Sequence, residues 1–130
     1  MTVTNVLAAI AVREHAPAVA WYAALFGRPH DAAPMEGLAE WWFPAGGWLQ
    51  VFADAERAGT SSITLVVDDI EAARRSLAAA GHESEWSFDG PITSGTVVRD
   101  PDGNRIVFAH SADPASNPSA AGWTQQRRTE

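Results

Sequence analysis

The residues of this sequence best suited to chemistry are aromatic rings gathered around a single amide. Residues 41–52 hold three of the six tryptophans and two of the five phenylalanines, together with Gln50. An indole or phenyl ring offers a flat surface on which a planar molecule can stack, and an amide both donates and accepts hydrogen bonds. This combination indicates recognition of a planar aromatic ligand. The same rings would also suit a packed core or a subunit interface, so both uses stay open.

Groups for covalent or metal chemistry are scarce. The chain contains no cysteine, which excludes disulfides, thiolate metal sites and cysteine nucleophiles. There is no paired-carboxylate motif, no nucleophile elbow and no serine–histidine spacing that would indicate a hydrolase. The histidines lack ligand spacing, and we expect them in loops or on the surface. They are His15, His30, His82 and His110.

The charge of the chain limits its partners. Sixteen acidic residues against nine basic ones give a formal net charge of −7, which repels a phosphate backbone and attracts cationic small molecules. Nucleic acid is therefore not an expected partner. Three carboxylates expected near the rim of the site, Glu36, Glu40 and Asp54, are placed to attract a ligand amine. With no membrane-length apolar run and no signal peptide, we expect a soluble cytoplasmic protein.

The elements that must position these side chains can be read from periodicity. Residues 6–12 alternate as a strand does, and residues 17–26 carry apolar side chains at helical spacing. Pro17 suits a first helical turn and Gly27 suits the left-handed residue after a helix end. Residues 40–43 and 48–52 then read as two strands joined by the turn 44–47.

The same order of elements recurs later in the chain. Residues 62–67 read as a strand, and Asp68 with Glu71 forms the capping-box pattern of a second helix that ends at Gly81. Strands follow near residue 86 and over 96–99 and 105–109, and the segment 100–104 between the last two reads as a tight hairpin turn. Gly81 lies 54 residues after Gly27, which predicts two tandem copies of one unit.

This pattern resembles the vicinal-oxygen-chelate superfamily of glyoxalases, bleomycin resistance proteins and extradiol dioxygenases. The resemblance covers about residues 5–110, from the helix ending at Phe26-Gly27 to the terminal Asp100-Pro101-Asp102-Gly103-Asn104 turn. It implies an α+β fold: two tandem βαβββ modules, about 5–54 and 60–110, forming a curved, cup-shaped mixed sheet with helices on its convex side. We expect one domain over 1–110, with the tail 111–130 packed on the domain or on a partner subunit.

The resemblance also bears on metal binding. The metal-dependent enzymes of the superfamily carry a ligand in each of four strands, and the corresponding residues here are Leu7, Gln50, Ser62 and Val107. A divalent metal needs at least three good ligands, and leucine and valine supply none. We therefore expect no metal and no other cofactor. Among its relatives, the chain most resembles the small metal-free bleomycin-binding proteins.

Alternation of side chains along the strands predicts the lining of the cup. The residues at 7, 9 and 11 and at 62, 64 and 66 would face inward, and because this set is less bulky than the helix-facing set it would leave room for a ligand. If Gln50 faces the cup, so do Trp48 and Phe52, and the hairpin adds either Trp41 and Phe43 or Trp42; we favour the former pair. The predicted ligand-binding residues are Leu38, Trp41, Phe43, Trp48, Gln50, Phe52, Ser62, Thr64 and Val107.

Two functions fit these expectations. The first is a binding protein that sequesters a planar aromatic, possibly cationic, antibiotic or natural product, acting as a homodimer with sites at the subunit interface, as the resemblance implies. The second is a metal-independent isomerase, cyclase or lyase acting on an aromatic intermediate, with Glu40, Gln50 or a histidine as acid or base. No positive catalytic motif favours the second, so we expect the first and predict no catalytic residues.

Overall fold

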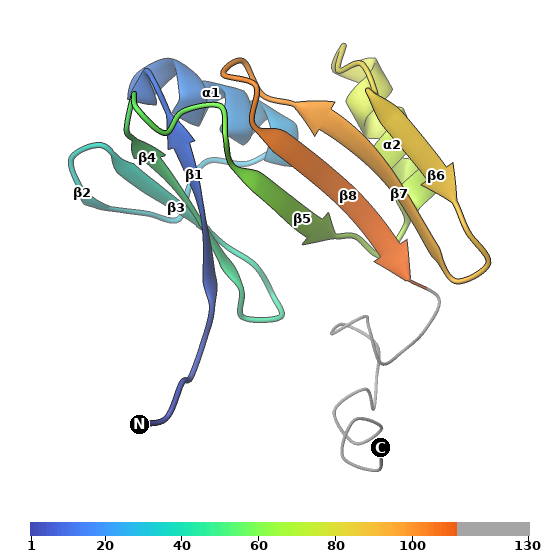
Figure 1. Cartoon of the computed structure of the whole chain (residues 1–130), viewed down its shortest axis with the longest axis horizontal. Coiled ribbons are helices and arrows are strands. Elements are labelled where there is room, and N and C mark those ends of the chain that lie inside the picture. Colours follow the sequence, from blue (N-terminus) through green and yellow to red (C-terminus); the bar gives the residue numbers. More distant parts are fainter. Residues whose placement is uncertain (112–130) are drawn as a thin grey trace. The chain divides into compact units, whose positions relative to one another are not determined.

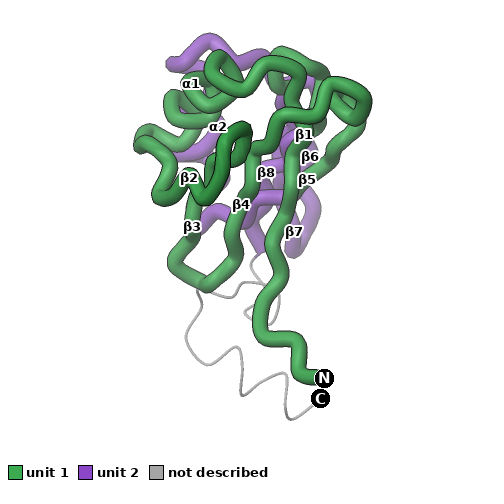
Figure 2. The backbone as a smooth tube through the Cα atoms, turned by 90° about the vertical axis from the view of Figure 1, so that its left-hand side faces the viewer, with its two compact units in different colours: residues 1–63, 99–105 green, residues 64–98, 106–130 purple. Residues whose placement is uncertain are grey.

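A computed structural model of the chain describes residues 1–111. These residues fall into two compact units (Figure 2). Unit 1 consists of residues 1–63 together with 99–105, and unit 2 consists of residues 64–98 with the residues from 106 onward. The expected tail, 111–130, lies outside the described residues except for Ser111. No helix of the described part is long and apolar enough to cross a membrane.

Unit 1 is built on a four-stranded mixed sheet. Its elements are β1 (Leu7–Val12), α1 (His15–Phe26), β2 (Ala32–Met35), β3 (Leu38–Trp42) and β4 (Trp48–Ala53). The strand order is β1-β4-β3-β2. Strand β1 runs parallel to β4, whereas β3 is antiparallel to both β4 and β2. Helix α1 connects the two outer strands, as Figure 1 shows.

The second sheet repeats this arrangement. Its elements are β5 (Ser62–Val66), α2 (Ile70–Ala79), β6 (Trp86–Asp89), β7 (Thr93–Arg99) and β8 (Arg105–Ser111), and its strand order is β5-β8-β7-β6. In both sheets the first strand pairs with the fourth, followed by the third and the second. The prediction of an α+β fold with two tandem βαβββ modules is confirmed. The cup and the single domain stay predictions.

The helix boundaries follow local chemistry, with one correction. Gly27 adopts φ 68°, and its N–H donates to the carbonyl of Ala23, as predicted for a left-handed helix end. The predicted N-cap Asp68 is wrong by one residue: Asp69 caps α2 by accepting from the backbone N–H of Ala72. Glu71 forms an ion pair with Arg74 instead of completing a capping box.

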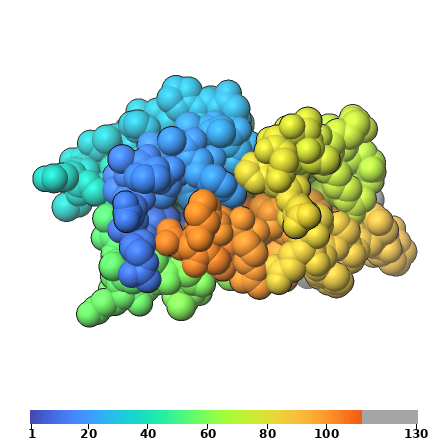
Figure 3. All heavy atoms as spheres, turned by 90° about the horizontal axis from the view of Figure 1, so that it is seen from above, coloured from blue at the N-terminus to red at the C-terminus, as the bar shows by residue number. Residues whose placement is uncertain are grey.

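The core of unit 1 lies between α1 and one face of its sheet. Tyr22 of α1 and Trp41 of β3 are both fully buried, and the Phe26 ring lies 5.6 Å from the Trp41 ring. In the space-filling view, the blue and cyan atoms of α1 and of the segment after it form a continuous layer (Figure 3). The same face of the sheet supplies Ile10, Val12, Leu49 and Val51, each at most 1% exposed. Burial of each such side chain stabilises the fold by roughly 1.5–3 kcal/mol.

The predicted turn 100–104 is present, and its side chains organise unit 1. One oxygen of Asp100, Oδ2, accepts from the Tyr22 hydroxyl at 2.7 Å and from Nδ2 of Asn104 at 2.8 Å. The fully buried Asn104 also donates to the carbonyl of Ala11 at 2.9 Å and accepts from the N–H of Ser61 at 2.9 Å. Burial, together with the hydrogen bond to Asp100, raises the pKa of Tyr22 well above its ordinary range.

We predict that Asn104→Ala lowers the free energy of unfolding by about 2–4 kcal/mol, because it removes the side-chain partner of the Ala11 carbonyl and of the Ser61 N–H and takes one of several donors from Asp100. The milder variant Tyr22→Phe should cost about 1–2 kcal/mol, since Asp100 keeps its other donors. Urea denaturation followed by tryptophan fluorescence measures both values. A smaller loss for Asn104→Ala than for Tyr22→Phe would contradict this account of the turn.

Candidate functional site

The strand register of unit 1 decides which side chains share a face. Gln50 of β4 pairs with Ala9 of β1 and with Glu40 of β3, and Trp42 pairs with Trp48. Because side chains alternate along a strand, these residues lie on the face of the sheet opposite α1. We call this surface the open face. It consists of Leu7, Ala9, Leu38, Glu40, Trp42, Trp48, Gln50 and Phe52.

The favoured assignment of Trp41 and Phe43 to this face is wrong, and the alternative, Trp42, is correct. The turn is closed by hydrogen bonds from the N–H of Phe43 to the carbonyl of Gly47 and from the N–H of Gly46 to the carbonyl of Phe43, and Trp42 lies opposite Trp48. Trp41 is fully buried beneath α1, with its Nε1–H donating to the carbonyl of Arg28 at 3.2 Å. The Phe43 ring packs on Phe26 at 5.7 Å. Both rings therefore belong to the helix side of the sheet.

A pocket of about 430 Å³ opens on this face within unit 1, a volume within the usual range for small-molecule sites. Three predicted residues line it: Leu38, Gln50 and Phe52. The sequence reasoning missed the contribution of the hairpin between β2 and β3, because the segment Ala-Ala-Pro-Met has no strand-like alternation. Gly37, with φ 77°, makes the turn of that hairpin. The remaining lining residues are Ala9, Met35, Glu36, Gly37 and Ala53.

Trp42 and Trp48 form a stacked pair on the open face, with ring centroids 4.9 Å apart and planes 25° apart. The backbone of Trp42 is held at both of its polar groups. Asp31 accepts from its N–H at 2.7 Å, and Arg28 donates to its carbonyl at 2.6 Å. Arg28 and Asp31 also pair with each other at 2.7 Å. This arrangement fixes the backbone of Trp42, which remains 42% exposed.

Glu40 differs from the expectation that it lies at the rim. It is only 5% exposed, and its carboxylate accepts from Nε2 of Gln50 at 2.8 Å and from Nε1 of Trp42 at 3.3 Å. Glu40 lies on β3, an inner strand flanked by β2 and β4, where the side chains of Gln50 and Trp42 contact it. The other two carboxylates expected at the rim, Glu36 and Asp54, have different surroundings. Glu36 lines the pocket, whereas Asp54 pairs with Arg57 at 3.2 Å.

The predicted residues of the second module are not among those lining this pocket. Ser62 and Thr64 are exposed while Ile63 between them is buried, which confirms the predicted alternation along β5. Val107 is 8% exposed and lies within the buried stretch of β8. A ligand contact by Ser62, Thr64 or Val107 stays a prediction.

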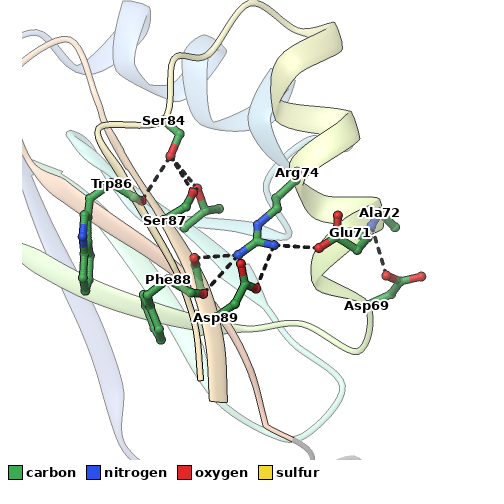
Figure 4. Close-up of polar contacts among 11 residues, drawn as sticks. Asp69, Glu71, Ala72, Arg74, Ser84, Trp86, Ser87, Phe88 and Asp89 are labelled. Atoms are coloured by element: carbon green, nitrogen blue, oxygen red, sulfur yellow. Dashed lines mark hydrogen bonds and ion pairs between the residues drawn. The ribbon is translucent and has the colours of Figure 1, made fainter. Parts of the chain in front are cut away.

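The sheet of unit 2 carries an aromatic pair of its own. Trp86 and Phe88 stack with centroids 4.9 Å apart on the side of β6 facing away from Arg74 (Figure 4). Gly95 of β7 lies beneath the Phe88 ring, where any Cβ would collide with it. On the other side, Arg74 of α2 donates to the carbonyls of Phe88 and Gly95 and pairs with Asp89 (Figure 4). Arg74 thus holds α2 against both strands.

The residues at the metal positions of related enzymes do not fit a metal ion. Leu7 and Val107 offer no donor atom, so Gln50 and Ser62 would supply at most two of the three or more ligands that a divalent metal needs. Within residues 1–111, no three histidine or acidic side chains lie close enough together to hold a metal. Two of the histidines, expected in loops or on the surface, are half-buried in regular elements: His15 begins α1 and contacts the carbonyl of Val51 at 3.2 Å, and His110 lies in β8.

Comparison with known proteins gives the same fold. The sequence matches the protein family of glyoxalase-like domains over residues 7–109. A glyoxalase/bleomycin resistance protein from Catenulispora acidiphila DSM 44928 is 30% identical, with a TM-score of 0.74 over 82% of this chain and 96% of that one.

More distant structures share the fold. The antibiotic binding protein TnmS3 from Streptomyces sp. CB03234 is 21% identical, with a TM-score of 0.74 over 86% of this chain and 99% of that one. A lactoylglutathione lyase from Agrobacterium tumefaciens is 18% identical, with a TM-score of 0.69 over 82% and 92%. No protein of curated function matches the chain significantly.

The hydrogen bond from the N–H of Trp42 to Asp31 should be lost when the Asp31 carboxylate is protonated in acid. The hydrogen bond from Arg28, followed by that from the N–H of Trp42, lowers the pKa of Asp31 below its usual 3.8. A lowered pKa means that the carboxylate contact is complete above pH 4 and is lost as the pH falls through the lowered value. We predict that the amide proton shift of Trp42, followed by NMR, titrates below pH 3.8 and that Arg28→Ala moves its midpoint upward. An unchanged midpoint in the variant would contradict the role of Arg28.

Proposed function

The chain belongs to the family of glyoxalase-like domains, and on that premise we propose that it is a metal-free binding protein. It sequesters a planar aromatic molecule, an antibiotic or a related natural product, in the cytoplasm. The observation that carries the proposal is the open face, where the stacked Trp42 and Trp48 and the half-buried Phe52 accompany a pocket of small-molecule size.

The binding free energy that such a site can supply is large enough to sequester a toxic ligand without any chemical step. Each stacked aromatic contact contributes roughly 0.5–1.5 kcal/mol beyond the burial of area. Burial of about 200 Å² of apolar ligand surface adds about 5 kcal/mol, at roughly 25 cal/mol per Å². Micromolar binding needs about 8 kcal/mol. Two rings and one pocket therefore approach that value, and a single hydrogen bond to the ligand makes up the difference.

Two features support this proposal over catalysis. The residues at the metal positions of related enzymes supply too few donor atoms, and the similar proteins include one described as an antibiotic binding protein. The net charge of −7 also favours a cationic ligand. The competing proposal, a metal-independent isomerase, cyclase or lyase, would use the Glu40–Gln50 pair as its acid and base.

The proposal predicts saturable quenching of tryptophan fluorescence by planar compounds such as anthraquinone antibiotics, with the compound recovered unchanged by mass spectrometry. Trp42→Ala should weaken binding at least about tenfold, because it removes one stacking surface and loosens the other. Trp86→Ala is the matched control, since this tryptophan is exposed to a similar degree on unit 2. An equal loss in the control would reject the open face of unit 1, and conversion of the compound would establish the enzyme instead.

We further propose that two copies of the chain form a homodimer with the binding sites at the shared interface. Large apolar side chains left exposed, including Leu7, Met35 and Trp42, would be covered by such an association. Sedimentation velocity at micromolar concentration should give a mass near twice 13.9 kDa. A Leu7→Arg variant should shift the protein toward the monomer, and a monomeric wild type would reject the dimer.

A further inference from the structure

The carboxylate of Glu40 is buried and is partnered by neutral groups. It accepts hydrogen bonds from the amide N–H of Gln50 and from the indole N–H of Trp42. The ion pairs found among the described residues involve Arg28, Arg57 and Arg74, and none of them reaches Glu40. A buried acid that is not neutralised by a cation depends on hydrogen-bond donors, and here both donors belong to the open face.

This contact determines how the amide of Gln50 is oriented. A carboxylate accepts hydrogen bonds but cannot donate them, so only the nitrogen of the amide can face Glu40. The carbonyl oxygen Oε1 must then point away from Glu40. Gln50 is half-buried and lines the pocket, and no donor within residues 1–111 reaches its Oε1. The pocket wall thus presents one hydrogen-bond acceptor of fixed orientation.

The same carboxylate also orients an aromatic surface. The indole N–H of Trp42 points to Oε1 of Glu40, which leaves the indole plane stacked on Trp48. One buried group therefore sets both the polar and the flat component of the open face. An acceptor beside a stacking surface suits a ligand whose N–H or O–H lies in the plane of its aromatic ring or close to it.

We propose that Glu40 is a positioning residue that makes the site selective for planar aromatics carrying a hydrogen-bond donor. The donor, a phenolic hydroxyl or an amine N–H, binds Oε1 of Gln50 while the ring stacks on the tryptophan pair. A matched ligand that has only an acceptor at that position leaves Oε1 unpaired and faces it with a second lone pair. This selectivity rests on the proposed binding function and specifies which ligands that function takes.

The test uses three naphthalene probes and calorimetric titration of the full chain. The probes are 2-naphthol, 2-methoxynaphthalene and 2-naphthylmethylammonium, which share a ring and differ in the attached group. We expect the wild type to bind 2-naphthol roughly ten- to hundredfold more tightly than 2-methoxynaphthalene. The ammonium probe distinguishes an amine N–H from a phenolic hydroxyl as the ligand's donor. If it binds more tightly than 2-naphthol, a cationic amine is the preferred donor.

The decisive variant is Glu40→Gln, which keeps the size of the side chain. A glutamine at this position can donate as well as accept, so the Gln50 amide is free to turn its nitrogen toward the pocket. The preference for 2-naphthol should fall to about threefold or less, while 2-methoxynaphthalene binds at least as well as before. Glu56→Gln is the control, since it makes the same charge change at an exposed loop residue outside the pocket, and it should retain the preference.

Each outcome has a distinct meaning. Equal binding of the two neutral probes by the wild type overturns the proposed selectivity but leaves the binding function intact. Absence of binding by all three probes at millimolar concentration overturns both. A purely structural role for Glu40 would weaken all probes by the same factor and leave their ratio unchanged. If Glu40→Gln does not fold, Gln50→Met removes the acceptor directly, and the preference should vanish there as well.

Discussion

The antiparallel pairing of β3 with β4 is the constraint on which the chemistry of unit 1 depends. It places Glu40 opposite Gln50 and Trp42 opposite Trp48, and it turns Trp41 toward α1. A shift by one residue would exchange the two faces, burying Trp42 under the helix and exposing Trp41. The turn after β3 and the side chains of Arg28 and Asp31, which hold the backbone of Trp42, both oppose that shift.

The buried position of Glu40 has a cost in stability. Removing a carboxylate from water is costly, and an apolar side chain of similar size would pack there without that cost. Local rules of stability are most often broken where a protein binds its ligand. In this chain the broken rule lies beside the stacked tryptophans and the pocket, whereas the buried polar groups of the turn 100–104 are satisfied by one another.

The sequence predicted most where a single residue type has one structural use. Gly27 ended the first helix as expected, and the turn 100–104 and the alternation of residues 62–64 were also correct. Prediction failed where the pairing of strands determines the structure. The composition of β2 is not typical of a strand, but the segment pairs with β3, and this pairing outweighs its low strand propensity. Trp41 and Trp42 are chemically identical neighbours, so only the turn geometry could distinguish them. The burial of Glu40 depends on strand order, which no local pattern contains.

Unit 1 is assembled from two stretches that are distant in the chain. Residues 99–105 complete it, and their hydrogen bonds reach back 78 residues to Tyr22 and 93 residues to Ala11. On a ribosome, the first 63 residues would emerge long before the segment that satisfies their buried groups. The hydroxyl of Tyr22 and the carbonyl of Ala11 therefore lack these two partners until most of the protein has been made. Such late closure delays cooperative folding and leaves a chain that stops before residue 99 open to proteases and chaperones.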